Sequence, residues 1–254
     1  MTVGKIFAAG RPALIGYLPA GFPTVEGGIE AITAMVDAGV DAVEVGFPYS
    51  DPVIDGPVIQ RATEAALAAG VRPADVLRTV ERVAALGVPA VVMTYWNPME
   101  RYGVARFARD LAAAGGAGLI TPDLIPDEAG EWIAASDEHG LDRIFLVSPS
   151  STEARVRSTT AACRGFVYAT ALKGVTGARD QVSSDAPALV ERVRAVTRTP
   201  VAVGLGVRDG AQAAAIGAFA DGVIVGSALV AALAEGGIAA VAALTADLAA
   251  GVRA

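Results

Sequence analysis

Two carboxylates lie eleven residues apart in the most unusual stretch of the chain, EVGFPYSDPVIDGP, at residues 44–57. Glu44 stands inside an apolar run, where a carboxylate is stable only if it is paired or protonated. Asp55 follows in a loop and precedes Gly-Pro. Two acids in different surroundings can divide the work of proton transfer and charge stabilisation. The pair is therefore a candidate for acid–base catalysis.

Each acid also has a purely structural interpretation. Glu44 could form a salt bridge or lie at an exposed strand edge, and Asp55 could accept hydrogen bonds from its own backbone in a turn. Alternation along a strand places Ala42, Glu44 and Gly46 on one face, so the acid has small neighbours. Small neighbours suit a barrel interior that has room for a ligand.

Glycine-rich segments follow three late strand-like runs of the chain. They are Gly174 to Gly177, Gly204-Leu205-Gly206 and Gly226-Ser227. Glycine allows backbone N–H groups to approach an anion closely, and a helix N-terminus presents the positive end of its dipole. Each segment alone could be an ordinary turn, but together they predict a phosphate site.

The composition excludes several classes of function. The chain carries 20 basic and 27 acidic residues, a net charge of −7, which argues against a nucleic acid or an anionic membrane as partner. Its only cysteine and only histidine, Cys163 and His139, allow no intrachain disulfide, histidine-rich metal cage or histidine-dependent triad. The first dozen residues lack a signal-peptide core, so we predict a cytoplasmic protein that binds a small molecule or a protein.

Eight strand-like apolar runs alternate with Ala-rich amphipathic stretches. The runs are nearly continuous in hydrophobicity, as in parallel strands covered on both faces. They span residues 13–18, 42–46, 90–95, 118–121, 144–147, 166–169, 201–204 and 222–225. Eight such units in 254 residues predict a single (β/α)8 TIM barrel domain over residues 1–254. The alternative is an open doubly wound sheet, which usually has fewer strands and a glycine fingerprint in its first turn.

Capping residues predict where several helices begin and end. We expect helices to begin at Thr24, Asp75, Asp127 and Asp209, and to end at Gly39 and Gly87. In a barrel of this kind the functional groups lie after the carboxyl ends of the strands. The expected elements would therefore bring the acids and the glycine-rich loops to one end.

The chain resembles the alpha subunit of tryptophan synthase over essentially its whole length. The segments that carry the resemblance are EVGFPYSDPVIDGPVIQRA, GVTGAR, GLGV and VGSALV, in that order. The resemblance implies a lyase of tryptophan biosynthesis, which cleaves indole-3-glycerol phosphate to indole and glyceraldehyde 3-phosphate without metal or organic cofactor. It also implies a partner beta subunit, in an alpha-beta-beta-alpha heterotetramer, that receives the indole.

The same resemblance assigns roles to individual residues. It places the catalytic glutamate on Glu44 and the catalytic aspartate on Asp55, and it implies no metal site. The residues that it assigns to substrate binding are Tyr95, Tyr168, Thr176, Gly177, Gly206, Gly226 and Ser227. Ile54, Phe22 and Pro122 depart from the commonest pattern of the family, but none of them removes a catalytic group.

Some residues and functions stay open at this level. Lys173 could form a Schiff base, or it could be a solvated residue or a helper at the phosphate site. Asp123 could orient neighbouring loops or belong to the site. The alternatives in function are a silent barrel that only activates a beta subunit, a phosphate-binding sensor, and an isomerase or synthase of phosphorylated sugars. Release of free indole by the purified chain separates these.

Overall fold

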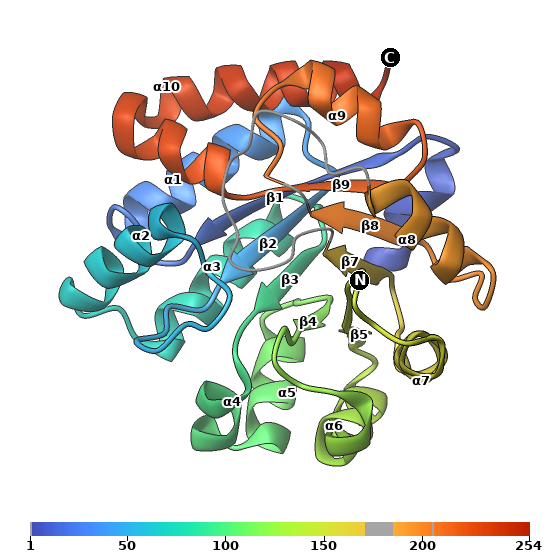
Figure 1. Cartoon of the computed structure of the whole chain (residues 1–254). Helices are drawn as coiled ribbons and strands as arrows, with labels where there is room; N and C mark the ends of the chain where they lie inside the picture. Colours follow the sequence, from blue (N-terminus) through green and yellow to red (C-terminus); the bar gives the residue numbers. More distant parts are fainter. Residues whose placement is uncertain (1, 171–184, 205) are drawn as a thin grey trace.

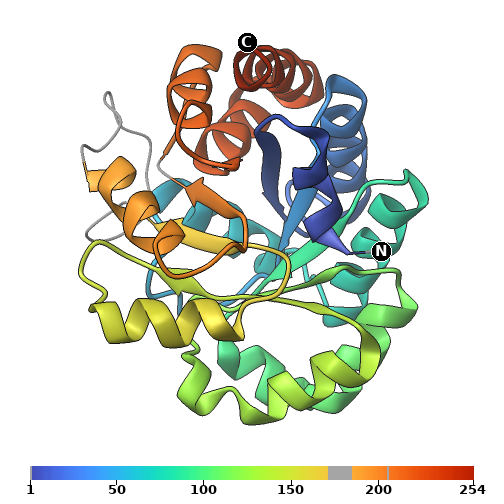
Figure 2. The same cartoon turned by 90° about the vertical axis from the view of Figure 1, so that its right-hand side faces the viewer.

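The computed structural model describes residues 2–170, 185–204 and 206–254, and it contains a parallel β-barrel inside a ring of helices (Figure 1). A view from a quarter turn away shows the same ring around the strands (Figure 2). The strands, in chain order, are β1 (Ala13–Pro19), β2 (Ala42–Gly46), β3 (Ala90–Met93), β4 (Gly118–Ile120), β5 (Asp142–Ile144), β6 (Leu146–Val147), β7 (Val167–Thr170), β8 (Val201–Gly204) and β9 (Gly222–Val225).

The sheet order explains why nine strands make an eight-position barrel. It runs β5-β4-β3-β2-β1-β9-β8-β7-β6, and every pairing within it is parallel. The two outermost strands, β5 and β6, are consecutive in the chain and separated only by Phe145. One broken strand therefore closes the barrel, with β5 paired to β4 and β6 paired to β7. This confirms the predicted TIM barrel and excludes the open sheet.

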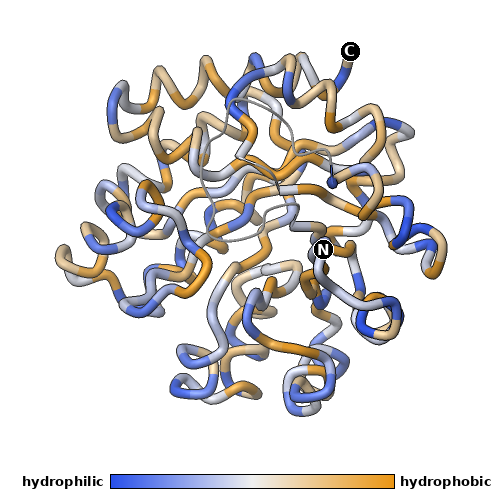
Figure 3. Tube along the Cα trace, viewed as in Figure 1, coloured by the Kyte–Doolittle hydropathy of each residue, from blue (hydrophilic) through white to orange (hydrophobic). Residues whose placement is uncertain are grey.

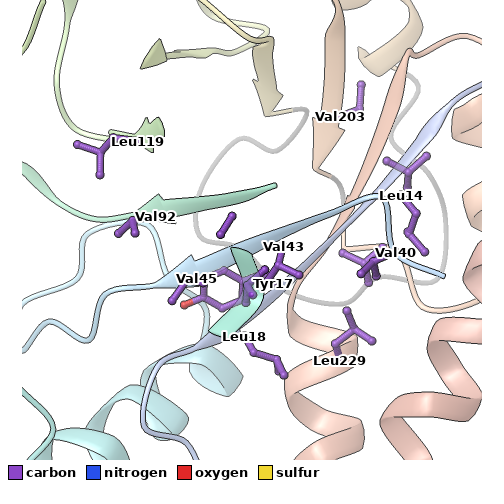
Figure 4. Packing of buried hydrophobic residues seen from close by; sticks show 14 of the residues in the cluster. Leu14, Tyr17, Leu18, Val40, Val43, Val45, Val92, Leu119, Val203 and Leu229 are labelled. Atoms are coloured by element: carbon purple, nitrogen blue, oxygen red, sulfur yellow. The ribbon is translucent and has the colours of Figure 1, made fainter. Parts of the chain in front are cut away.

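Strand alternation divides the core into two layers. On β2 the side chains of Val43 and Val45 pack in the larger cluster, between the strands and the helices (Figure 4). Ala42 belongs to the second cluster, inside the barrel. The trace coloured by hydropathy has apolar segments along the central strands and also along the helices around them (Figure 3). Parallel strands covered on both faces have this continuous hydrophobicity.

The helices cover the barrel from outside. They are α1 (Val25–Ala38), α2 (Pro57–Ala68), α3 (Pro73–Ala85), α4 (Trp96–Tyr102), α5 (Val104–Ala113), α6 (Gly130–His139), α7 (Glu153–Ala162), α8 (Asp185–Arg194), α9 (Gly210–Gly217) and α10 (Ser227–Val252), with two 3-10 segments, η1 (Val3–Ala9) and η2 (Pro126–Glu128).

Three of the predicted helix ends are confirmed by cap geometry. The Thr24 hydroxyl accepts from the Gly27 N–H at the start of α1, and Asp209 accepts from the Gln212 N–H at the start of α9. Gly39 ends α1 in the left-handed conformation, with φ 109°.

The other three predicted ends are displaced by up to three residues. The N-cap of α3 is Arg72, not Asp75. Asp75 lies in the first turn of the helix, where its carboxylate accepts from the Arg72 N–H. Asp127 lies inside η2 instead of opening α6, whose cap is Ala129. Gly87 has φ +79° just beyond α3, which ends at Ala85.

The interior is filled at the amino ends of the strands and left open at the carboxyl ends. Residues Ile15, Ala42, Val91 and Ala202 form a buried cluster inside the barrel, and Val3 of η1 joins it with no exposed surface. The backbone N–H of Val3 also donates to the Asp142 carboxylate at 2.7 Å. The segment η1 thus closes one end of the barrel, so that any ligand must enter at the other.

Helix α10 is long and apolar enough, by length and composition alone, to cross a membrane. Its backbone is broken at Gly237, with φ 66° and ψ −160°, so neither half reaches the roughly 20 residues that a span needs. It packs against α1, α9 and β1. These contacts identify it as an outer helix of the barrel.

Candidate active site

A cavity of about 570 Å³ opens at the carboxyl ends of the strands. Its lining comes from every position around the barrel and from the loops that follow the strands. The lining residues include Tyr17, Glu44, Ile54, Asp55, Ile59, Met93, Pro122, Leu146, Ser148, Ser150, Ser151, Tyr168, Thr170, Gly204, Gly206, Ile224, Gly226 and Ser227. The two predicted acids and three of the predicted glycine and serine positions therefore share one cavity.

Glu44 points into this cavity from the middle of β2. Its side chain is almost completely buried, and its Oε2 atom has no hydrogen-bond partner in the part of the chain that is described. Burial, together with the negative charge of Asp55, raises the pKa of Glu44 to about 8. At neutral pH the group is therefore a buried, protonated acid.

Asp55 lies on the loop between β2 and α2, beside the cavity. Burial raises its pKa to about 6, while a hydrogen bond from the Tyr95 hydroxyl lowers it. The Tyr95 hydroxyl also accepts from the Ile54 N–H at 3.1 Å, which fixes the backbone next to Asp55. Asp55 is consequently ionised at neutral pH, where Glu44 retains its proton.

Two glycines make room for tyrosine hydroxyls inside the barrel. A Cβ on Gly46 would lie 2.3 Å from the Tyr17 Oη, and a Cβ on Gly204 would lie 2.5 Å from the Tyr168 Oη. No side chain fits at such distances, so the glycines at the ends of β2 and β8 let both rings lie across the cavity. Tyr17 is paired with Glu44 in the register of β1 and β2.

The opposite side of the cavity suits an anion. Gly206 has φ +71°, a conformation that favours glycine, and Gly226 precedes Ser227 at the start of α10. A helix start directs free N–H groups and the positive end of its dipole toward a bound anion. Among the described lining residues there is no lysine or arginine. Of the predicted residues, Lys173, Thr176 and Gly177 lie outside the described residues.

Two other candidate residues, Tyr95 and Asp123, are not among the described lining residues of the cavity. The Tyr95 hydroxyl contacts the β2–α2 loop, where it accepts from the Ile54 N–H. Asp123 accepts two hydrogen bonds from the Trp96 N–H, at 2.9 and 3.1 Å. It therefore fixes the backbone at the start of α4.

Sequence reasoning missed several lining residues. Tyr17 lies on a strand that reads as ordinary core, and Ser148, Ser150 and Ser151 form a loop after β6 that reads as ordinary punctuation. Only their position after or within a barrel strand could have indicated them. Three residues depart from the commonest pattern of the resembled family. Of these, Ile54 and Pro122 line the cavity, whereas Phe22 packs against the core.

The described residues offer no metal site, and the thiol of Cys163 is buried. Among the described residues, no group of three His, Cys, Asp or Glu side chains could hold a metal ion. The Cys163 thiol donates to the Phe145 carbonyl at 3.9 Å, and burial raises its pKa to about 12. His139 ends α6, as expected of a residue near a helix C-terminus. The described part of the cavity offers acid–base chemistry and anion binding.

Comparison with known proteins points to a single family. The family model described as "Tryptophan synthase alpha chain" matches residues 4–250. A tryptophan synthase alpha chain from Salinispora arenicola is 67% identical over 254 residues, which is 98% of this chain and 95% of that protein. One from Mycobacterium avium is 65% identical and covers 99% of this chain and 94% of its own length.

Solved structures agree with the sequence comparisons. A structure of Mycobacterium tuberculosis tryptophan synthase matches with a TM-score of 0.95 and 62% identity, covering 99% of this chain and 98% of that one. A chain of the tryptophan synthase complex from Pyrococcus furiosus matches with a TM-score of 0.86 and 31% identity, covering 94% of this chain and 98% of its own. The similarity thus extends over the whole barrel.

Proposed function

Because the chain belongs to the tryptophan synthase alpha chain family, we propose that Glu44 and Asp55 carry out the reaction of that family. The chain is a lyase that cleaves indole-3-glycerol phosphate to indole and glyceraldehyde 3-phosphate. It works with a beta subunit, to which the indole passes, in an alpha-beta-beta-alpha heterotetramer. The observation that carries the proposal is the placement of both acids, with their pKa values moved apart, in one cavity.

The reaction breaks the bond between indole C3 and the first carbon of the glycerol chain. C3 receives a proton, the hydroxyl on the chain carbon loses one, and the electron pair of the broken bond returns to the ring. The chain carbon becomes the aldehyde of glyceraldehyde 3-phosphate, so atoms and electrons balance without an oxidant or reductant. Positive charge develops on the indole nitrogen as C3 is protonated.

Glu44 is suited to move both protons. Because its pKa is raised to about 8, it is protonated at neutral pH and can donate to C3. Once ionised in its buried position it is a stronger base than an ordinary carboxylate and can accept the proton of the chain hydroxyl. One carboxyl can therefore act first as the acid and then as the base.

Asp55 is suited to stabilise the charge on the ring nitrogen. It remains ionised when Glu44 is protonated, and the Tyr95 hydroxyl holds its carboxylate at the rim of the cavity. A carboxylate that accepts the indole N–H hydrogen bond binds more strongly as positive charge develops there. This difference favours the transition state over the bound substrate.

The phosphate acts as a remote handle that orients the reacting carbon. We assign it to the backbone N–H groups around Gly206, Gly226 and Ser227, with Gly177 as a further candidate, and we assign Thr176 to substrate binding beside Asp55. Tyr168, whose ring lies across the cavity, is assigned to the substrate pocket. Binding energy from such a handle holds the reactants in a reactive geometry.

Substitution of the acids tests the catalytic assignment. Glu44→Gln and Asp55→Asn should each lower turnover by about 10² to 10⁴, the usual contribution of a positioned acid–base or charge-stabilising group, with the fold intact. Free indole released from indole-3-glycerol phosphate is the measurement. Glu64→Gln, at an exposed site on α2, is a matched control that should be unaffected. Near-normal turnover in either active-site variant would reject the assignment.

The phosphate assignment has its own test. Gly206→Asp places a carboxylate beside the proposed anion site, so it should weaken competition by inorganic phosphate or glycerol phosphate. Unchanged phosphate affinity in this variant would contradict the placement. Gly140→Asp is the matched control, because Gly140 also has a positive φ but lies at the end of α6.

We further propose that residues 1–254 act as one domain in the cytoplasm. The closed barrel, with η1 at one end and α10 packed against β1, supports the first part. The biosynthetic reaction of the family supports the second.

A further inference from the structure

A turn of three serines forms part of the cavity wall after β6. This serine loop consists of Ser148, Pro149, Ser150 and Ser151, and all three serines line the cavity. The Ser148 N–H donates to the Ser151 Oγ at 3.0 Å, and the Ser151 N–H donates to the Ser148 carbonyl at 3.0 Å. The Ser148 and Ser150 hydroxyls are 2.9 Å apart. The loop therefore gathers its hydroxyl groups at one place.

One arginine holds this loop from behind. Arg192, a half-buried residue of α8, donates from Nη1 to the Pro149 carbonyl at 3.2 Å and from Nη2 to the Ser151 carbonyl. The guanidinium group has a rigid fork of donors, so two carbonyls bound by it keep a fixed separation. Arg192 is not among the described cavity-lining residues, so its influence on the cavity passes through the serine loop.

The serine loop extends the polar side of the cavity by one barrel position. In the sheet order β6 adjoins β7, which adjoins β8 and β9. Thr170 at the end of β7 also lines the cavity, between the serine loop and Gly206. The apolar lining residues Met93 and Pro122 belong to the β3 and β4 positions. A polar arc thus follows the proposed phosphate site around the barrel.

We propose that the Ser148 and Ser150 hydroxyls bind the hydroxylated part of the substrate chain, and that Arg192 is the positioning residue that holds them there. This inference rests on the proposed function. Backbone N–H groups only donate, which suits a phosphate, whereas a serine hydroxyl both donates and accepts, which suits another hydroxyl. The chain between ring and phosphate carries two hydroxyl groups. Along the polar arc, backbone N–H groups would thus face the phosphate, and the serine hydroxyls beside them would face the hydroxyl groups of the chain.

Serine substitutions test the contact. Ser148→Ala and Ser150→Ala should each raise KM for indole-3-glycerol phosphate about 5- to 10-fold, the usual effect of one lost hydrogen bond. The Kd for indole-3-propyl phosphate, which keeps the ring and phosphate but lacks both chain hydroxyls, should not change. Ser158→Ala, at an exposed serine of α7, is the matched control.

Two results would overturn the proposed contact. Unchanged KM in both serine variants would show that the hydroxyls do not reach the substrate. An equal loss of affinity for both compounds would place the serines on the phosphate instead of the hydroxyls. Neither result depends on the roles of Glu44 and Asp55, whose own failure would instead appear as normal turnover in the Glu44→Gln and Asp55→Asn variants.

Arg192 substitutions test the positioning role. Arg192→Met removes both donors and should raise KM for indole-3-glycerol phosphate about 10-fold, with a smaller change in kcat and with the Kd for indole-3-propyl phosphate retained. Arg192→Lys, which keeps the charge and N–H donors but lacks the rigid planar fork, should restore part of the loss. Arg157→Met, at an exposed arginine of α7, controls for the loss of charge.

A merely structural role for Arg192 predicts a different pattern. In that case Arg192→Met would lower Tm and weaken both compounds alike, and Arg192→Lys would not separate them. That pattern, or unchanged KM in Arg192→Met, would overturn the positioning role.

Discussion

At the scale of single residues, the site depends on two carboxyl groups whose environments differ. Glu44 is enclosed by the barrel and keeps its proton, whereas Asp55 lies at the rim and receives a hydrogen bond from Tyr95. Burial is the main cause of the raised pKa in both groups. The pKa is about 8 for Glu44 and about 6 for Asp55, so between these pH values Glu44 is a protonated acid and Asp55 is an anion.

The first prediction concerns the pH dependence of the reaction. The proposed roles need a protonated Glu44 and an ionised Asp55, so kcat/KM should fall below about pH 6 and above about pH 8. In Asp55→Asn the remaining activity should lose the acidic limb, and the basic limb should move to lower pH because the charge of Asp55 no longer raises the pKa of Glu44. Initial rates of indole formation between pH 5 and 9 provide the measurement. A flat profile in the unmodified protein would contradict the assigned protonation states.

The second prediction links the same burial to stability. The pKa of Glu44 rises from 4.5 to about 8 on folding, so the native state retains a proton that the unfolded chain releases. The native state is therefore destabilised progressively as pH rises from about 4.5 through about 8. Glu44→Gln lacks this titration, so its free energy of unfolding relative to the unmodified chain should increase with pH.

The size of this effect follows from the same shift. The free energy of unfolding of Glu44→Gln, relative to that of the unmodified chain, should be on the order of 3 kcal/mol larger at pH 7 than at pH 4.5. Urea unfolding of both proteins at several pH values measures the difference, and Glu64→Gln serves as the exposed control. A gain that is the same at all pH values would show that Glu44 titrates normally.

At the same scale, the sequence predicted the acids because their types were unusual for their positions. A glutamate in an apolar strand and an aspartate in a Pro- and Gly-rich loop are visible without coordinates. Tyr17 and the serines were not visible, because a tyrosine in a strand and serines in a turn are common. Their importance arises only from the direction of the side chain, which closure of the barrel determines.

At the scale of elements, the loop between β2 and α2 sets the position of Asp55. Tyr95, the residue before α4, connects to this loop through its hydroxyl, and its ring packs on Tyr49 with centroids 5.4 Å apart. Asp123 in turn holds the first N–H of α4. The loop that carries Asp55, the proposed charge-stabilising group, is thus supported by the two strand positions that follow β2.

The third prediction removes this support. Tyr95→Phe loses the hydrogen bond to Asp55 and the acceptor for the Ile54 N–H, so kcat/KM should fall about tenfold. The hydrogen bond lowers the pKa of Asp55, so its loss should move the acidic limb of the pH profile to higher pH. Tyr102→Phe, which removes a hydroxyl bonded to Asp110 elsewhere, is the control. An unmoved acidic limb in Tyr95→Phe would contradict the role of this hydroxyl.

The order and type of the elements followed from the sequence better than their ends did. The hydrophobic runs predicted a strand at every barrel position. The run at 144–147 is predicted as one strand, but the structure has two strands there, β5 and β6. The break at Phe145 is a feature of sheet closure, which no local pattern encodes. Likewise Asp127 has a capping residue type, but the preceding Pro126 begins a 3-10 turn there, and α6 starts after it.

At the scale of the whole molecule, the two ends of the barrel have separate tasks. The amino ends of the strands are filled by an apolar cluster that includes Val3 and Phe166, with Phe7 against Phe166 at 5.8 Å between ring centroids. The carboxyl ends carry the cavity and all the described residues assigned to the reaction. In barrels of this kind the first end contributes to stability and the second to chemistry.

The fourth prediction tests this separation. Val3→Ala removes two methyl groups from a fully buried site at the closed end, so the free energy of unfolding should fall by about 2 kcal/mol and Tm by about 4 to 8 °C. The KM for indole-3-glycerol phosphate at 25 °C should stay unchanged, because the closed end lies outside the cavity lining. Ile238→Ala, at a partly exposed position of α10, should change Tm much less. A rise in KM that accompanies the loss of stability in Val3→Ala would mean that the filled end also determines the geometry of the site.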